Sequence, residues 1–156
     1  MILYHGTYVD FQEIILDKCL PYKDFGRGFY LTDIYSQAVA LSQKKSRIYG
    51  GEPIVQRYEF DQSILTDGVL KVLKFDGPSR DWAEFIYKNR SRQICFSHDY
   101  DIVIGPIADD GVAYLLDRYE EGTLSLDDLA KELKYKNLNN QYFFANSNAL
   151  KLLKRL

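Results

Sequence analysis

The sequence predicts an α+β fold with a split, mainly antiparallel sheet and peripheral helices. Predicted strands and helices do not alternate regularly along the chain, which argues against a doubly wound parallel sheet. The chain also lacks the GxGxxG and Walker patterns of common nucleotide-binding parallel folds. Its 156 residues show no linker, repeat or break in composition. We therefore expect one α+β domain spanning residues 1–156, long enough to bury a proper core.

The first half of the chain predicts strands around one helix. Residues 1–4 form a short apolar run that ends at His5-Gly6-Thr7, and strand ends commonly display functional groups. Asp33 is expected to cap a helix that Gly50-Gly51 ends. The apolar face of that helix is expected to hold Ile34, Ala38, Leu41 and Ile48. Residues 54–61 alternate as a strand with Gln56, Tyr58 and Phe60 on one side, and residues 70–75 predict another.

The second half predicts helices around two apolar strands. Ser79 is expected to cap a helix over residues 80–91 that buries Trp82, and residues 100–105 to form a central strand. Further helices are expected over residues 110–121 and 125–136, the latter with a capping box from Ser125 to Asp128. Residues 140–145 predict a last strand. Ser147 is expected to cap a short basic helix that runs to Leu156.

Composition excludes several classes of function. The net charge of −2 argues against a strongly basic nucleic-acid-binding surface. Cys19 and Cys95 lie far apart without CxxC spacing, so we predict no metal site and expect both to be small buried hydrophobes. A leader sequence and an apolar run of transmembrane length are both absent from the sequence. We therefore expect a cytoplasmic protein without membrane contact.

Residues 24–42 contain the densest group of candidate ligand-binding residues. Gly26 and Gly28 flank Arg27, and Tyr30 follows within a short apolar segment. Glycines let the backbone approach a ligand, arginine pairs with phosphate and an aromatic ring stacks on a flat base. This combination favours a ligand that carries both phosphate and an aromatic ring.

Three separated motifs stand out: Leu3-Tyr4-His5-Gly6-Thr7, the segment 25–33 that begins Phe-Gly-Arg-Gly, and Gln141-Tyr142-Phe143-Phe144. Together they resemble the motifs of the diphtheria-toxin-like and poly(ADP-ribose)-polymerase-like ADP-ribosyltransferases. Residues 3–7, Leu-Tyr-His-Gly-Thr, resemble the first motif of that family. Residues 25–33, from Phe-Gly-Arg-Gly to Thr-Asp, resemble the second motif, and residues 141–144 are similar to the third. The order and spacing agree, and the chain is most similar to compact bacterial members, several of which resemble toxins paired with antitoxins. The resemblance implies a split two-sheet fold around an NAD cleft.

The resemblance also implies roles for individual residues. His5, Tyr30 and Gln141 would be the catalytic residues, with NAD as co-substrate and no metal. His5 would bind a ribose hydroxyl, the Gly6 peptide groups the nicotinamide carboxamide, and Tyr30 the nicotinamide ring. The remaining residues expected to bind NAD are Thr7, Arg27 and Gly28, with Arg27 facing the pyrophosphate.

The chain departs from the family pattern at three positions. Gln141 stands where the third motif usually has Glu, and an amide can hydrogen-bond a ribose hydroxyl but cannot accept a proton. Ala38 and Leu41 stand where polymerase-like members have Ser and Tyr. We therefore expect transfer of a single ADP-ribose unit rather than polymer synthesis. Glu84, Asp109 and Asp110 are candidate acids that could compensate, although we expect each to be a solvated or helix-capping residue.

The leading hypothesis is a toxin-like mono-ADP-ribosyltransferase that modifies a macromolecule, with protein slightly favoured over nucleic acid as acceptor. An antitoxin partner is implied by the resemblance alone. An NAD glycohydrolase, with water as acceptor, is an alternative. A third hypothesis, kept open by Gln141, is a pseudoenzyme that binds NAD or ADP-ribose and acts through a partner. A nucleic-acid-binding module without catalysis fits the net charge of −2 poorly.

Overall fold

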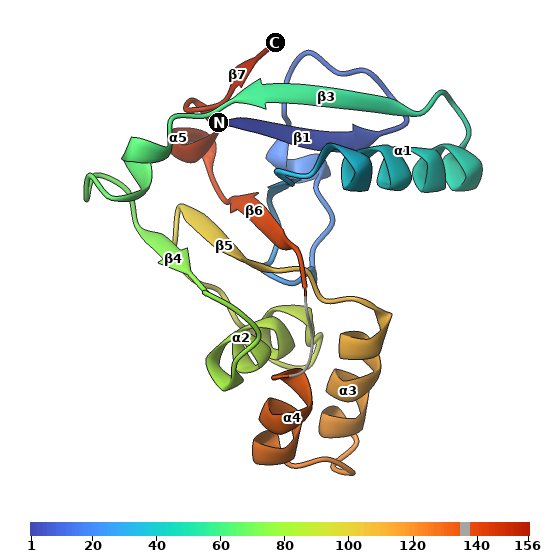
Figure 1. Ribbon diagram of the computed structural model, residues 1–156, viewed down its shortest axis with the longest axis vertical. Helices are drawn as coiled ribbons and strands as arrows, with labels where there is room; N and C mark the ends of the chain where they lie inside the picture. The colour runs from blue at the N-terminus through green and yellow to red at the C-terminus, as the bar shows by residue number, and fades with distance from the viewer. Residues whose placement is uncertain (135–137) are drawn as a thin grey trace.

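The computed structural model describes residues 1–134 and 138–156 and has a mixed α+β architecture (Figure 1). One sheet has three strands in the order β1-β3-β7, and the other has four in the order β2-β6-β5-β4. The strands are β1 Ile2–Thr7, β2 Phe29–Leu31, β3 Ile54–Glu59, β4 Val72–Lys74, β5 Ile102–Pro106, β6 Asn140–Phe144 and β7 Lys154–Arg155. The helices are α1 Tyr35–Tyr49, α2 Arg80–Arg90, α3 Asp110–Glu120, α4 Leu126–Leu133 and α5 Ser147–Leu150, with 3-10 turns η1 Leu16–Lys18 and η2 Gln62–Leu65.

The strand pairing confirms the predicted α+β class and the mainly antiparallel sheets. Within the described residues β4 and β5 pair in parallel, and the other ladders are antiparallel. The predicted central strand, β5, lies between β6 and β4. It is buried along its whole length, as its run of apolar residues indicates.

The two sheets meet where β1 passes β2. Tyr4 and Thr32 form an isolated antiparallel bridge, in which each N–H donates to the other residue's C=O at 2.7 and 2.9 Å. Beyond this bridge β1 pairs with β3, while β2 pairs with β6. We call the residues Tyr4, His5 and Gly6 of β1, with Tyr30 and Thr32 of the β2 segment, the junction.

Helix α1 packs on β1 through small residues. A Cβ atom at Gly6 would lie 2.2 Å from the C=O oxygen of Ala38, so only glycine allows this approach. Ala38 and Ser42 are the buried residues of the helix. The predicted apolar face is wrong at Leu41 and Ile48, which are 43% and 60% exposed, because the packed face contains small residues rather than large apolar ones.

The predicted C-terminal end of α1 is confirmed, and the predicted N-cap is wrong. Gly50 has φ of 80° and ends the helix, as predicted. Asp33 is not the N-cap: Ile34 occupies that position without providing a side-chain cap, and the helix begins at Tyr35. The hydroxyl of Thr32 instead accepts from the Ile34 N–H at 3.2 Å, so the residue before the predicted cap satisfies that backbone group.

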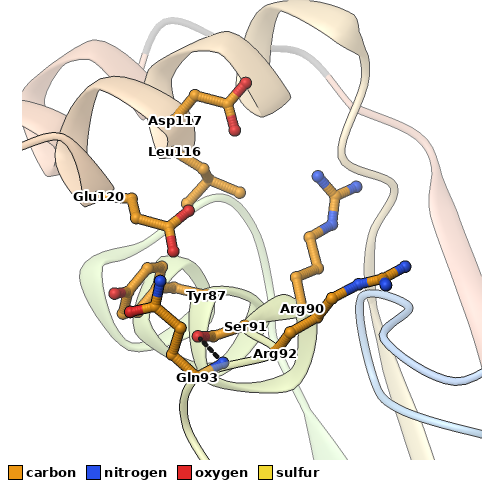
Figure 2. A pocket seen from close by; sticks show the side chains of 8 residues that line it. All are labelled: Tyr87, Arg90, Ser91, Arg92, Gln93, Leu116, Asp117 and Glu120. Atoms are coloured by element: carbon orange, nitrogen blue, oxygen red, sulfur yellow. Dashed lines mark hydrogen bonds between the residues drawn. The ribbon is translucent and has the colours of Figure 1, made fainter.

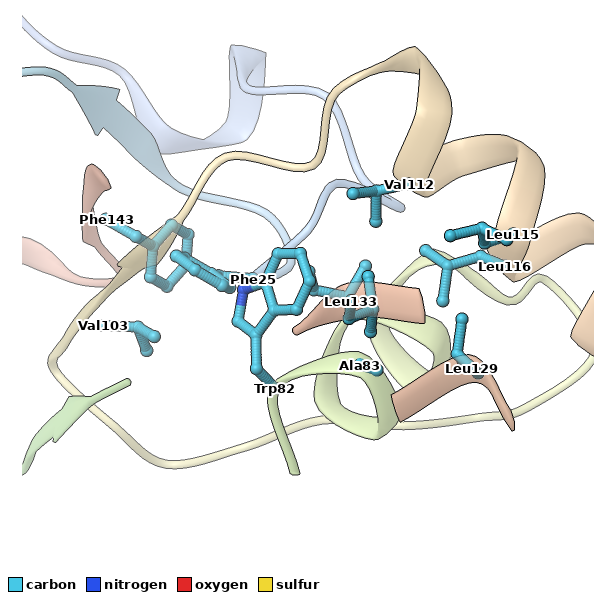
Figure 3. Close-up of a cluster of buried hydrophobic side chains, with 11 residues drawn as sticks. Phe25, Trp82, Ala83, Val103, Val112, Leu115, Leu116, Leu129, Leu133 and Phe143 are labelled. Atoms are coloured by element: carbon cyan, nitrogen blue, oxygen red, sulfur yellow. The ribbon is translucent and has the colours of Figure 1, made fainter. Parts of the chain in front are cut away.

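Apolar side chains gather in two clusters. One surrounds Trp82, which is fully buried, and joins α2, α3 and α4 to β5 and β6 (Figure 3). The other lies between the two sheets and contains Leu3, Phe29, Leu31, Tyr58, Phe60, Ile102, Ile104, Tyr142, Phe144 and Ala149. Trp82 is therefore a core residue, as expected from its helical face.

Two predicted N-caps are present in the structure, at helices α2 and α4 in the lower part of Figure 1. Ser79 accepts from the Trp82 N–H at 3.1 Å, and Ser125 accepts from the Asp128 N–H at 3.1 Å. Both helices therefore begin where the sequence predicts. The last two residues of the predicted helix 125–136 lie outside the described residues.

The C-terminal prediction is wrong in its second half. Asn146, rather than Ser147, caps α5 by accepting from the Ala149 N–H at 3.1 Å. Helix α5 ends at Leu150, and the chain then forms β7 on the edge of β3. Lys154 and Arg155, which suggested a helix end, instead form β7, where Lys154 pairs with Glu59 of β3.

The cysteine prediction is wrong for Cys95. That residue is exposed, whereas Cys19 is half-buried, and neither forms a disulfide. Within residues 1–134 and 138–156, no helix combines the length and apolarity needed to cross a membrane.

Candidate functional site at the junction of the two sheets

His5 is fixed at the junction by a hydrogen bond between its ring and the backbone of Tyr30 in β2. Its Nδ1 lies 2.8 Å from the C=O oxygen of Tyr30, and its ring stacks on Phe29 with ring centres 4.5 Å apart. Burial, assisted by the nearby Lys45 ammonium, lowers the pKa of His5 to about 4. The imidazole is therefore neutral near pH 7, and because a carbonyl only accepts, Nδ1 carries the proton. The lone pair of Nε2 is then an acceptor for a ligand hydroxyl.

We predict that His5 makes the protein less stable on mild acidification. The imidazole has an ordinary pKa of 6.5 in the unfolded chain and one of about 4 in the folded protein. Between these values the unfolded state binds more protons, so the free energy of unfolding decreases as the pH is lowered, by up to about 3 kcal/mol. Urea titrations across this window should show a shallower pH dependence for His5→Gln than for the wild type. Parallel profiles would contradict the assignment.

The peptide groups of Gly6 point toward the β2 side of the junction. The N–H and C=O of Tyr4 both bond to Thr32 on that side, and residues two apart on a strand direct these groups the same way. Gly6 therefore directs its N–H and C=O to the side where β2 no longer pairs with β1, and this C=O already accepts from Lys45 Nζ at 2.8 Å through one of its two lone pairs. A primary carboxamide, which needs one of each, is the complementary group.

Lys45 is a site residue that the sequence did not single out. Its Nζ donates to the Gly6 C=O at 2.8 Å. Burial, assisted by Lys23, lowers the pKa of its ammonium group. Lys45 follows Ala38 by seven residues, two helical turns, and this spacing places it on the α1 face that contacts β1. That spacing is the signal that could have identified it.

Positive charge collects beside the junction. Lys23 acts electrostatically on Lys45, and both Arg27 and Lys45 act on the Cys19 thiol, whose pKa burial raises. Neither Lys23, Arg27 nor Lys45 forms an ion pair with a carboxylate of the described residues. Such a group of cations suits a phosphate or pyrophosphate.

Tyr30 holds the glycine-rich loop together. Its hydroxyl donates to the Gly26 C=O at 2.8 Å and accepts from the Phe25 N–H at 3.0 Å. Burial raises the pKa of this hydroxyl above its usual range. The ring lies against Phe143, with ring centres 5.0 Å apart, on the face of β2 opposite to Phe29. The rings of His5 and Tyr30 thus lie on opposite faces of β2, and the two residues meet through the Tyr30 carbonyl.

Gln141 lies on the same face of the four-stranded sheet as Tyr30. Tyr30 pairs directly with Phe143 of β6, and Gln141 precedes Phe143 by two residues. Its Nε2 donates to Asp24 Oδ2 at 2.8 Å and to the Pro106 C=O at 3.2 Å. Asp24 is a buried acid that the sequence analysis missed, although it directly precedes the Phe25–Gly28 motif.

The other predicted binding residues differ in their availability. Arg27 is exposed in its loop and can reach an anion. Gly28 is packed against β6: a Cβ atom there would lie 2.3 Å from the Phe143 ring, so glycine serves the packing of the loop. The Thr7 hydroxyl is buried and closes a local turn, donating to the Val9 C=O at 3.2 Å.

The three candidate compensating acids lie outside this constellation. Glu84 pairs with Lys88 on the surface of α2 at 2.7 Å. Asp109 caps α3 by accepting from the Val112 N–H at 2.8 Å, and Asp110 is exposed in the first turn of that helix. Each has the surface or capping role that the sequence also allowed.

A pocket of about 350 Å³ lies between the end of α2 and α3 (Figure 2). Its lining includes Arg90, Arg92, Asp117 and Glu120, and Arg90 also reaches Asp24. The junction residues do not line it. No group of His, Cys, Asp and Glu side chains suited to a metal ion occurs in the part of the chain that the structure describes.

Comparison with known proteins gives one match. The model of a family described as a protein of unknown function, DUF3990, matches residues 1–155. No curated protein and no solved structure matches the chain.

Proposed function

The chain belongs to the DUF3990 family, and from its own residues we propose that it is an NAD-dependent mono-ADP-ribosyltransferase. The observation that carries the proposal is the junction. There His5 offers an acceptor at Nε2, and Gly6 offers a paired donor and acceptor. These groups complement a ribose hydroxyl and a carboxamide, which the nicotinamide half of NAD contains. Lys23, Arg27 and Lys45 supply the charge that suits its pyrophosphate.

The proposed reaction breaks the bond between the ribose C1′ and the nicotinamide nitrogen. The bonding electrons leave with the nitrogen, so cationic nicotinamide departs as a neutral molecule and positive charge develops on the ribose. The acceptor nucleophile then bonds to C1′ and loses its proton to solvent. The chain contributes by holding the carboxamide at Gly6 and ribose hydroxyls at His5 and Gln141 in a fixed pose.

Single transfer is favoured over polymer synthesis. Ala38 is buried against Gly6, and its methyl side chain cannot donate a hydrogen bond. Leu41 is exposed on α1 and offers no second aromatic face. Neither position therefore supplies the hydroxyl contact or the stacking surface that the polymerase-like motif would place there.

The proposal is tested by incubating the purified protein with NAD labelled in its adenylate part, with and without a cell lysate. Release of nicotinamide together with labelling of a defined macromolecule is the expected result. Free ADP-ribose formed without an acceptor would identify a glycohydrolase instead. Saturable binding of NAD without turnover would identify a pseudoenzyme, and absence of binding would refute an NAD site.

We predict that Lys45→Met raises the KM for NAD about tenfold and changes kcat little, because the ammonium group contacts the substrate equally before and during reaction. The matched control is Lys44→Met, which removes an exposed ammonium group from the adjacent position of α1. Initial rates at several NAD concentrations separate the two parameters. Equal effects of both substitutions would show that Lys45 acts only through the overall charge of the protein.

A toxin role and an antitoxin partner are proposed from the resemblance of the three motifs. Expression in a bacterium is expected to arrest growth and to deplete NAD or modify one macromolecule. The protein with His5→Ala serves as the control, since it is expected to fold and to lose turnover. Normal growth with full-length protein and unchanged NAD would refute the toxin role without bearing on activity in solution.

A further inference from the structure

A single buried carboxylate joins three distant segments behind the glycine-rich loop. Asp24 is 8% exposed and precedes Phe25 of that loop. Arg90, at the end of α2, donates from Nε to Oδ1 at 2.8 Å, and its Nη2 lies 2.7 Å from the same oxygen as an ion pair. The other oxygen, Oδ2, accepts from Gln141 Nε2 at 2.8 Å and from the Ala108 N–H at 3.3 Å. Three hydrogen-bond donors thus reach the Asp24 carboxylate, and its charge is balanced by Arg90.

These contacts fix the polarity of the Gln141 amide. Both groups that face its nitrogen, Asp24 Oδ2 and the Pro106 C=O, are acceptors, so the NH₂ group must point toward them. The amide oxygen is therefore turned away from this pair. Oε1 has no hydrogen-bond partner among the described residues. Every fully buried side-chain oxygen or nitrogen of those residues has a partner, so Oε1 is not fully buried and keeps access to solvent. It is an acceptor on the sheet face that carries Tyr30.

The same contacts explain why residue 141 is an amide. A glutamate would place a second carboxylate oxygen near Asp24 Oδ2 and the Pro106 C=O, where nothing could donate. Two carboxylates that share a partly desolvated site cannot both remain ionised. The Asp24 carboxylate and the Gln141 amide are therefore complementary, and a change at one position requires a change at the other.

We propose that Asp24 is a positioning residue that, held by Arg90, orients the Gln141 amide so that Oε1 receives a ribose hydroxyl of the substrate. This proposal rests on the function proposed above. It assigns the negative charge of this part of the site to Asp24 rather than to residue 141. Restoring the glutamate of the third motif should then damage the site instead of activating it.

The first test is Gln141→Glu. We expect NAD turnover to fall about tenfold or more, as for other losses of a supporting hydrogen bond. The midpoint of thermal unfolding should also fall at pH 7.5 and recover toward the wild-type value at pH 5, where one carboxyl takes up a proton. An unchanged midpoint with increased kcat would overturn the proposal. Glu84→Gln, an acid-to-amide change on α2, is the control and should leave both measurements unchanged.

The second test is rescue. Asp24→Asn should weaken the orientation of the Gln141 amide and raise the KM for NAD, because the Pro106 C=O would then be the one remaining assured acceptor for its NH₂ group. Adding Gln141→Glu to Asp24→Asn re-creates a donor–acceptor pair with reversed polarity. The double variant should regain at least part of the thermal midpoint and turnover lost in each single variant. Additive losses in an active protein would refute the role of Asp24. Wild-type protein that neither binds nor turns over NAD would refute the proposed function, and the thermal coupling of the two positions would still be measurable.

Discussion

Replacement of Tyr30 by alanine is expected to reduce NAD turnover about a hundredfold or more, since small displacements of groups that hold a reacting substrate cost that much. The Tyr30 ring packs against Phe25 and Phe143, with ring centres 6.4 and 5.0 Å away. Its hydroxyl bonds to the backbone of Phe25 and Gly26. The substitution therefore removes the predicted stacking surface and also releases the loop that carries Arg27.

Tyr30→Phe separates these two contributions. It keeps the ring and leaves the Phe25 N–H and the Gly26 C=O without their partner, a loss of about 1–3 kcal/mol for a buried group. We expect an intermediate effect, with the KM for NAD raised more than kcat is lowered. Measurements of kcat and KM are combined with circular dichroism to verify folding. Full turnover by folded Tyr30→Ala would remove Tyr30 from the site.

Trp82→Ala is expected to lower the free energy of unfolding by about 3–5 kcal/mol, as is typical for removing a large buried aromatic side chain. Trp82 is fully buried in the cluster that joins α2, α3 and α4 to the four-stranded sheet (Figure 3). Its Nε1–H also donates to the Pro106 C=O at 3.2 Å, so the variant leaves that oxygen with one donor fewer.

Urea denaturation followed by circular dichroism measures this loss. Tyr114→Ala is a suitable control, because Tyr114 is an aromatic residue of α3 that is 62% exposed. A surface change of this kind is expected to shift the free energy of unfolding by no more than about 0.5 kcal/mol. Similar losses for both variants would show that the cluster around Trp82 contributes less than its burial indicates.

The Gln141 contacts change how the departure from the family motif is interpreted. Taken alone, an amide in place of Glu keeps the pseudoenzyme hypothesis open. With Asp24 Oδ2 at 2.8 Å from Nε2, the amide is instead the residue type that its surroundings require. The substitutions at positions 24 and 141 therefore test whether the two side chains form a donor–acceptor pair, rather than the identity of either residue alone.

The sequence alone determined the elements whose signals are local. Serine caps at positions 79 and 125, the glycine stop at Gly50 and the alternation of residues 54–61, of which 54–59 form β3, each depend on neighbours within a few residues. These elements occur where they were predicted. The two-residue strand β7 was missed because it exists only through its pairing with β3.

The tertiary structure decided which side chains meet. Arg90 and Gln141 are separated from Asp24 by 66 and 117 residues, and no local pattern connects them. The exposure of Leu41 and Ile48 could not be predicted from local sequence either. The close approach of β1 at Gly6 makes Ala38 and Ser42 the buried face of α1. Motifs in the sequence indicated His5, Gly6 and Tyr30 as a group. Their orientation, and the acid that accompanies them, follow from packing between strands and helices that are distant in the chain.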